Sequence, residues 1–316
     1  MPLRARVGII GLGRRWRRYR PALSDLRKRL LVRAVYDQRP ARAERVAREL
    51  SCAAAAGPTD LLERDDVEAV LLFDPQWFGL WPLEQAARLG KPVFCAVSPS
   101  HDDAHADEVR RRVQAASLPV MATLTPSLCP AVTRLRDMLT PRLGPARLVR
   151  CDWCGPSSSP TPAPGLRAVP ALLHICAELL GGEPANVWMT AAEGARFAEV
   201  LLEFPGGRAA QLNLWAGPRR ACRIQAVTDD ADLVAGLPYT LRWRRGEGSH
   251  TFRASRRPLP RLLLERFLDA LAAGAPPEPD FGDAYRALLW TRAARRSLAE
   301  GRRIELGAGS REMKSV

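Results

Sequence analysis

The sequence predicts an α/β chain in two domains: a doubly wound parallel sheet covered by helices, then an α+β domain with a mixed, mostly antiparallel sheet. Strand and helix patterns alternate over the first ~120 residues, the order typical of a parallel sheet with crossover helices. A glycine-rich turn follows the first strand. Beyond residue 187, apolar and polar side chains alternate every second residue, which indicates a sheet with one covered face. We therefore expect one domain over residues 1–122 and another over 123–316.

Each element of the first domain has its own sequence pattern. Apolar runs predict strands at 6–10, 31–36, 67–73, 92–97 and 119–123, and amphipathic runs predict helices at 41–50, 80–89 and 100–116, with a short helical turn at 60–64. Right-handed crossovers bring the carboxyl ends of such strands to one edge of the sheet, where ligands bind.

The turn after the first strand has the residues that a diphosphate needs. Gly11 and Gly13 permit a tight turn and a close backbone approach over a helix N-terminus, although Trp16 occupies the place of the third glycine in G-x-G-x-x-G. Asp37 ends the second strand, 24 residues beyond Gly13, near the ~20-residue offset of an acid that binds the adenosine ribose.

Strand, turn, helix, strand and acid in this order predict a Rossmann domain that binds a nicotinamide dinucleotide. The predicted cofactor-binding residues lie at strand ends: Gly11, Leu12, Gly13, Arg14, Arg15, Trp16, Asp37, Phe73, Asp74, Pro75 and Val97. Asp37 favours NAD because it repels a 2′-phosphate. Arg14, Arg15 and Arg39 leave NADP open.

The second domain is predicted from a different order of helix and strand patterns. A helix at 130–139, a strand at 146–153, a Pro/Ser-rich loop at 155–165 and a helix at 169–180 precede strands at 187–192, 197–204, 209–215, 222–228 and 240–245, and helices at 259–273 and 284–300 close the chain.

Composition limits the partners and the compartment. The 316 residues carry a formal net charge of +14, but arginine dominates the basic residues, as in GC-rich genomes, and follows no nucleic-acid-binding motif. We therefore expect no nucleic-acid partner. No apolar run reaches the ~18 residues of a membrane span, and no leader is expected before the first strand. Seven cysteines without a disulfide framework indicate a cytoplasmic protein.

Several segments resemble the Gfo/Idh/MocA family, which includes glucose–fructose oxidoreductase and inositol dehydrogenase. The segments are Val7-Gly-Ile-Ile-Gly-Leu-Gly13, Leu61-Leu-Glu-Arg-Asp-Asp-Val-Glu-Ala-Val70, Gly90-Lys-Pro-Val-Phe-Cys95 and the tail from Phe267 to Leu306. The resemblance implies hydride transfer at a sugar or polyol carbon of a small-molecule substrate. It also implies a homo-oligomer, a dimer or tetramer, formed through the second sheet.

The catalytic motifs of that family are incomplete here. Relatives carry Glu-Lys-Pro where this sequence has Ala96, Val97 and Ser98, so the usual lysine is replaced by Val97. His174 matches the histidine of a second motif, Asp-x-Gly-x-His-x-x-Asp, while the other motif positions are Pro170, Leu172 and Ala177. The resemblance makes His174 the candidate catalytic acid–base residue. The alternative is a histidine buried in a helix interior.

The resemblance and the departures from its motifs leave three functions open. The first is an NAD(P)-dependent oxidoreductase that acts on a sugar, polyol or other carbonyl compound. The second is a catalytically degenerate dinucleotide-binding protein that serves as a sensor or partner subunit. The third is a reductase for a flat conjugated ligand, as in the biliverdin reductase branch of the superfamily, for which Trp77, Phe78 and Trp81 would form the pocket wall.

Two spacings are compatible with metal binding but are explained without it. His101 and His105 lie four residues apart, yet the acids around them fit the first turn of a helix. Cys151 and Cys154 form a lone C-x-x-C in a strand, without a second pair. We expect no metal site.

Overall fold

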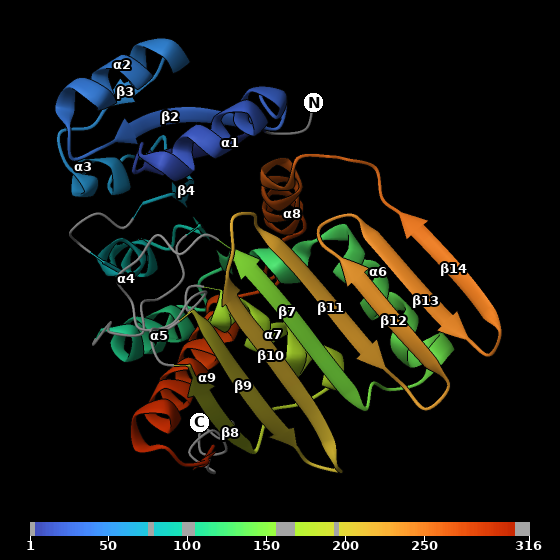
Figure 1. Ribbon diagram of the computed structural model, residues 1–316. Helices are drawn as coiled ribbons and strands as arrows, with labels where there is room; N and C mark the ends of the chain where they lie inside the picture. Colours follow the sequence, from blue (N-terminus) through green and yellow to red (C-terminus); the bar gives the residue numbers. More distant parts are fainter. Residues whose placement is uncertain (1–3, 75–78, 97–104, 156–167, 193–195, 307–316) are drawn as a thin grey trace. The chain divides into compact units, whose positions relative to one another are not determined.

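Figure 1 shows the computed structural model of the chain, which describes residues 4–74, 79–96, 105–155, 168–192 and 196–306. The chain forms two compact units, one of residues 1–123 with 257–285 and one of residues 124–256 with 286–316. The first break lies next to the boundary expected from the sequence. The first unit also includes residues 257–285, a C-terminal segment that the sequence assigned to the second domain.

In the described residues, the first unit contains a six-stranded sheet in the order β3-β2-β1-β4-β5-β6, and every neighbouring pair is parallel. The strands are β1 (Ala5–Ile10), β2 (Leu30–Tyr36), β3 (Ala53–Ala54), β4 (Ala69–Leu72), β5 (Val93–Cys95) and β6 (Val120–Ala122). The strand order reverses at β1, as in a Rossmann fold, so the predicted doubly wound sheet is confirmed.

The helices of the first unit are α1 (Arg14–Asp25), α2 (Pro40–Leu50), α3 (Pro58–Leu62), α4 (Trp81–Arg88), α5 (Ala106–Ala115) and α8 (Leu259–Ala273). In α2, Pro40 sits in the first turn, where its missing N–H costs nothing, and the buried Ala43, Val46 and Ala47 form one apolar stripe.

Helix α8 belongs to the first unit because its apolar face packs there. It contacts α1, and the Phe267 ring lies 5.7 Å from the Phe94 ring, centroid to centroid. Beyond α8, the Ala122 N–H donates a 2.9 Å hydrogen bond to the Pro279 carbonyl. The sequence predicted this helix with its observed bounds but gave no sign of the unit on which it packs.

The second unit, within the described residues, contains a nine-stranded sheet in the order β14-β13-β12-β11-β7-β10-β9-β8-β15. Its strands are β7 (Leu148–Gly155), β8 (Asn186–Ala191), β9 (Phe197–Phe204), β10 (Arg208–Ala216), β11 (Ala221–Val227), β12 (Ala231–Gly236), β13 (Thr240–Arg245), β14 (Gly248–Arg253) and β15 (Ile304–Glu305). Among the described strands of this sheet, β7 and β10 are the one parallel pair, so the predicted mixed, mostly antiparallel sheet is confirmed.

Helices α6 (Pro130–Met138) and α7 (Val169–Leu180) lie against one face of this sheet (Figure 1). Short helices η1 (Thr125–Leu128) and η2 (Leu139–Leu143) flank α6, and α9 (Phe281–Glu300) follows α8 along the chain. In β8 the buried Val187 and Met189 alternate with outward residues such as Trp188. The alternation of apolar and polar residues in the sequence is therefore explained by a sheet with one covered face.

Within the described residues, none of the helices combines the length and apolar character needed to cross a membrane.

Candidate functional site

The glycine turn of the first unit joins β1 to α1. The Gly11 N–H donates to the Tyr36 carbonyl at 2.9 Å, and Gly11 has φ +88°, in the left-handed region that favours glycine. A Cβ on Gly11 would also lie 2.7 Å from the Asp74 backbone nitrogen. The turn at this position therefore requires glycine on two independent grounds.

Helix α1 begins at Arg14, directly after the turn. Among the described residues, no side chain caps this helix start, and Arg14 and Arg15 are exposed in its first turn. Free N–H groups at a helix N-terminus attract anions, and the two guanidinium groups add positive charge. The turn therefore fits the diphosphate of a dinucleotide.

Asp37 is held by the chain around it. Its side chain is only 2% exposed, and one carboxylate oxygen accepts the Leu12 N–H at 2.8 Å while the other accepts the Arg39 N–H at 3.0 Å. The Arg42 guanidinium lies 3.3 Å from both oxygens. In this arrangement the carboxylate fixes the glycine turn to β2, and its role in holding a ribose stays a prediction.

We expect Asp37→Ala to destabilise the first unit by about 1–3 kcal/mol, because the buried Leu12 N–H and Arg42 would lose their acceptor. Thermal unfolding of the variant and the wild type measures the loss. The control is Asp65→Ala, which removes an exposed acid from the same unit. Equal melting temperatures for all three proteins would contradict this role.

Trp16 and Phe73 lie in the core of the first unit. Trp16 is 3% exposed and Phe73 is fully buried, with ring centroids 6.3 Å apart. The indole thus projects from α1 into the core, at the position where the third glycine of the G-x-G-x-x-G motif would stand. Because the Phe73 side chain is fully buried, a contact of this residue with the coenzyme would have to come from its backbone.

The Asp74 carboxylate lies next to the glycine turn. A Cβ on Gly13 would lie 2.7 Å from an Asp74 carboxylate oxygen, so this oxygen closely borders the turn. The sequence placed Asp74 among the cofactor-binding residues without indicating this contact. Pro75, Trp77, Phe78, Val97 and His101 lie outside the described residues.

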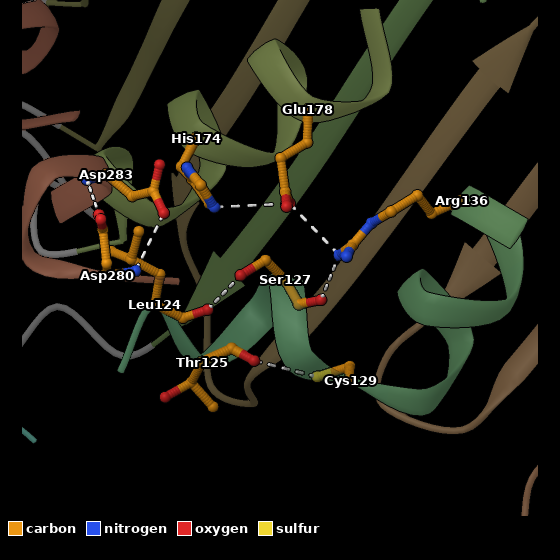
Figure 2. Close-up of polar contacts among 9 residues, drawn as sticks. All are labelled: Leu124, Thr125, Ser127, Cys129, Arg136, His174, Glu178, Asp280 and Asp283. Carbon is orange, nitrogen blue, oxygen red and sulfur yellow. Dashed lines mark hydrogen bonds and ion pairs between the residues drawn. The ribbon is translucent and has the colours of Figure 1, made fainter. Parts of the chain in front are cut away.

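His174 of the second unit belongs to a network of polar side chains between α7, α6 and η1 (Figure 2). His174 is 6% exposed, and its Nε2 lies 3.5 Å from Glu178 Oε2. Glu178 Oε2 also lies 3.3 Å from an Arg136 guanidinium nitrogen, which donates to the Ser127 carbonyl at 3.0 Å. A carboxylate shared by an imidazole and a guanidinium can hold the histidine ring in one orientation.

Sequence reasoning missed Glu178 and Arg136. The family motif directed attention to an acid three residues after His174, where Ala177 stands, while one turn of α7 brings the acid at the fourth position alongside. The i, i+4 spacing was a usable signal. Arg136 comes from another helix, so nothing in the sequence linked it to this site.

The C-x-x-C cysteines do not form a pair. Residues three apart in a strand point to opposite faces of the sheet, and Cys151 Sγ instead lies 3.7 Å from Cys176 Sγ in the core. The hydrogen bond with Cys176 and burial raise the pKa of the Cys151 thiol well above its usual range. Burial raises the pKa of Cys222 to about 12. These thiols are therefore not nucleophiles at neutral pH.

Parts of the chain are similar to proteins of known function. Residues 5–117 match the model of an oxidoreductase family with an NAD-binding Rossmann fold, GFO_IDH_MocA. A curated relative, dTDP-3,4-didehydro-2,6-dideoxy-α-D-glucose 3-reductase from Saccharopolyspora spinosa, is 39% identical over 80 residues, which are 23% of this chain and 24% of that protein. The match thus spans about a quarter of the relative's length.

Solved structures share the whole fold. UDP-N-acetylglucosamine 3-dehydrogenase from Acidithiobacillus ferrooxidans has a TM-score of 0.84 at 22% identity, over 94% of this chain and 99% of that one. Levoglucosan dehydrogenase, in complex with NADH and levoglucosan, has a TM-score of 0.82 at 14% identity, over 96% and 100%.

The sheet order and the glycine turn define the class of the first unit as a Rossmann domain of the dinucleotide-binding type. Over residues 5–117 the chain is similar to the Gfo/Idh/MocA oxidoreductase family, whose model describes an NAD-binding Rossmann fold.

Proposed function

We propose that this chain is an NAD(P)-dependent oxidoreductase that transfers a hydride to or from a sugar-, polyol- or other carbonyl-type small molecule. The observation that carries the proposal is the uncapped glycine turn with two exposed arginines at the start of α1. The sugar-modifying relatives favour a sugar among these substrates.

The residues at the turn have separate tasks in this proposal. Gly11 and Gly13 keep the backbone open, the first N–H groups of α1 bind the diphosphate, and Arg14 and Arg15 balance its charge. A bound nicotinamide supplies or accepts the hydride. The chain itself must move the proton that leaves or enters the substrate oxygen when alcohol and carbonyl interconvert.

We assign the proton transfer to His174. A neutral imidazole accepts the hydroxyl proton in the oxidative direction, and the imidazolium returns it in the reductive direction. Glu178 is a positioning residue, since it acts through the histidine, and Arg136 holds Glu178 in place. His174 and Glu178 together thus supply the acid–base group in this chain, where Val97 replaces the lysine of the family motif.

We expect Glu178→Gln to lower kcat roughly tenfold, a fraction of the ~10²–10⁴-fold effect of a positioned acid–base group. The variant removes the charged partner that orients the imidazole, so kcat should fall while coenzyme affinity changes less than twofold. Steady-state rates and coenzyme titration measure the two effects, and Glu183→Gln, on an exposed acid, is the control. An unchanged kcat would contradict the positioning role.

We expect Asp74→Asn to tighten dinucleotide binding about fivefold or more, because the carboxylate bordering Gly13 repels the diphosphate. Asparagine keeps the shape and removes the charge. Fluorescence titration with NADPH and NADH at low and high salt measures the change, and the gain should shrink as salt rises. Weaker binding by the variant would show that Asp74 instead supports the ligand.

Turnover tests the proposal directly. The full chain is incubated with NADH or NADPH and a panel of ketoses, ketosugar nucleotides and inosose, and absorbance at the nicotinamide band is followed. The proposal expects oxidation of the coenzyme with at least one sugar-type carbonyl. No turnover with any carbonyl, despite saturable coenzyme binding, would contradict it.

The degenerate dinucleotide-binding protein is the second candidate function. The replacement of the family lysine by Val97 and the burial of His174, which is 6% exposed, favour it. It expects coenzyme binding without hydride exchange, so the same assay separates the two functions.

We also propose that the open face of the second sheet forms a homo-oligomer. Leu148, Trp188 and Phe197 lie on this face and are 41%, 48% and 40% exposed. Large apolar side chains at one face favour association. We further propose that the protein works in the reducing cytoplasm, because its seven cysteines follow no disulfide framework in the sequence.

A further inference from the structure

A cavity of about 280 Å³ lies beside the glycine turn, between α1 and α2. We call it the arginine-lined cavity. Its wall consists of Leu12, Gly13, Trp16, Arg17, Arg20, Arg42, Arg45, Val46 and Glu49. Four of these nine residues are arginines, and a single acid faces them. The cavity thus adjoins the place proposed for the coenzyme and carries a strong excess of positive charge.

The arginines differ in their partners. Arg20 forms an ion pair with Glu49 at 3.2 Å, and Arg42 pairs with Asp37 at 3.3 Å. Within the described part of the chain, Arg17 and Arg45 have no acidic group within 4 Å, and both are exposed. Two guanidinium groups of the cavity are therefore available to an anion.

Asp37 repels an anion in the arginine-lined cavity less than a solvent-exposed carboxylate would. Its side chain is 2% exposed, its oxygens accept two backbone N–H groups, and Arg42 balances its charge. The sequence favoured NAD because the Asp37 carboxylate was expected to repel a 2′-phosphate. The hydrogen bonds and the ion pair of Asp37 largely neutralise this repulsion.

We propose that the arginine-lined cavity binds the 2′-phosphate of NADP(H), so that the enzyme prefers NADP(H) to NAD(H). The inference rests on the proposed function. The 2′-phosphate is the one chemical difference between the two coenzymes and carries about two negative charges at neutral pH. Arg17, Arg42 and Arg45 surround the space beside Gly13 with donors suited to its oxygens.

The experiment is a titration of the full chain with NADPH and with NADH, followed by nicotinamide fluorescence. We expect NADPH to bind at least about tenfold more tightly, as for one to two charge-assisted hydrogen bonds. Arg45→Gln and Arg17→Gln should each weaken NADPH binding about fivefold or more and change NADH binding less than twofold. Arg48→Gln, on an exposed arginine of α2 outside the cavity, is the matched control.

The possible failures are distinguishable. Binding of both coenzymes with NADH equal or tighter would overturn the inference and leave the proposed function intact. Equal weakening of both coenzymes by Arg45→Gln would also overturn it, since the cavity would then hold a part that they share. Binding of neither coenzyme would overturn the inference and the proposed function together.

Discussion

Replacing His174 with alanine is expected to lower kcat by ~10²–10⁴-fold, the usual contribution of a positioned general acid–base group. The imidazole is the group to which we assign the proton, and Glu178 lies 3.5 Å from its Nε2. Coenzyme affinity should change less than twofold, because His174 and the glycine turn belong to different compact units. Steady-state kinetics and coenzyme titration of the same preparation measure the two effects.

Two further variants make this result interpretable. His174→Gln keeps a polar side chain in the buried position and guards against a loss of folding, and it should lose as much kcat as the alanine variant. His250→Ala, on an exposed histidine that stacks on Trp243, should keep the wild-type rate. A wild-type kcat in either His174 variant would favour the alternative of a histidine that only packs in the helix interior.

Replacing Phe94 with alanine is expected to destabilise the first unit by about 3–5 kcal/mol, the range for truncation of a buried aromatic residue. Phe94 is fully buried at the centre of an aromatic cluster, and its ring centroid lies 5.6 Å from Tyr19, 6.2 Å from Phe73 and 5.7 Å from Phe267. Since Phe267 lies on α8, the loss should also loosen that helix.

Urea unfolding followed by far-UV circular dichroism measures this change. Phe197→Ala is the control, because this phenylalanine is 40% exposed and should cost less than about 1 kcal/mol. A small effect at Phe94, similar to that at Phe197, would mean that α8 does not share the core of the first unit.

The sequence predicted the two sheets because their patterns are local. Strand β9 and helices α7 and α8 have the bounds expected from the sequence pattern. Strands β12 and β14 were not predicted. In β14 every residue but Phe252 is exposed, so this edge strand lacks the apolar alternation on which the prediction depends.

The site residues could be predicted only where they lie together in one short segment of the sequence. The glycine turn and His174 follow from short motifs. The contacts of Asp37 with Leu12 and Arg42, by contrast, depend on how β2 and α2 lie against the turn, and a sequence gives the residue type without its partners. The same limit explains Arg136, which reaches Glu178 from another helix.

Binding of a nicotinamide dinucleotide is the claim on which the proposed function depends, and calorimetric titration of the full chain with NADPH and NADH measures it most directly. We predict one coenzyme molecule per chain, with a Kd between about 1 μM and 1 mM, the usual range of KM values. We also predict loss of this binding in Gly11→Ala, where a Cβ would meet the Asp74 backbone. No saturable heat with either coenzyme in the wild-type chain would contradict the account.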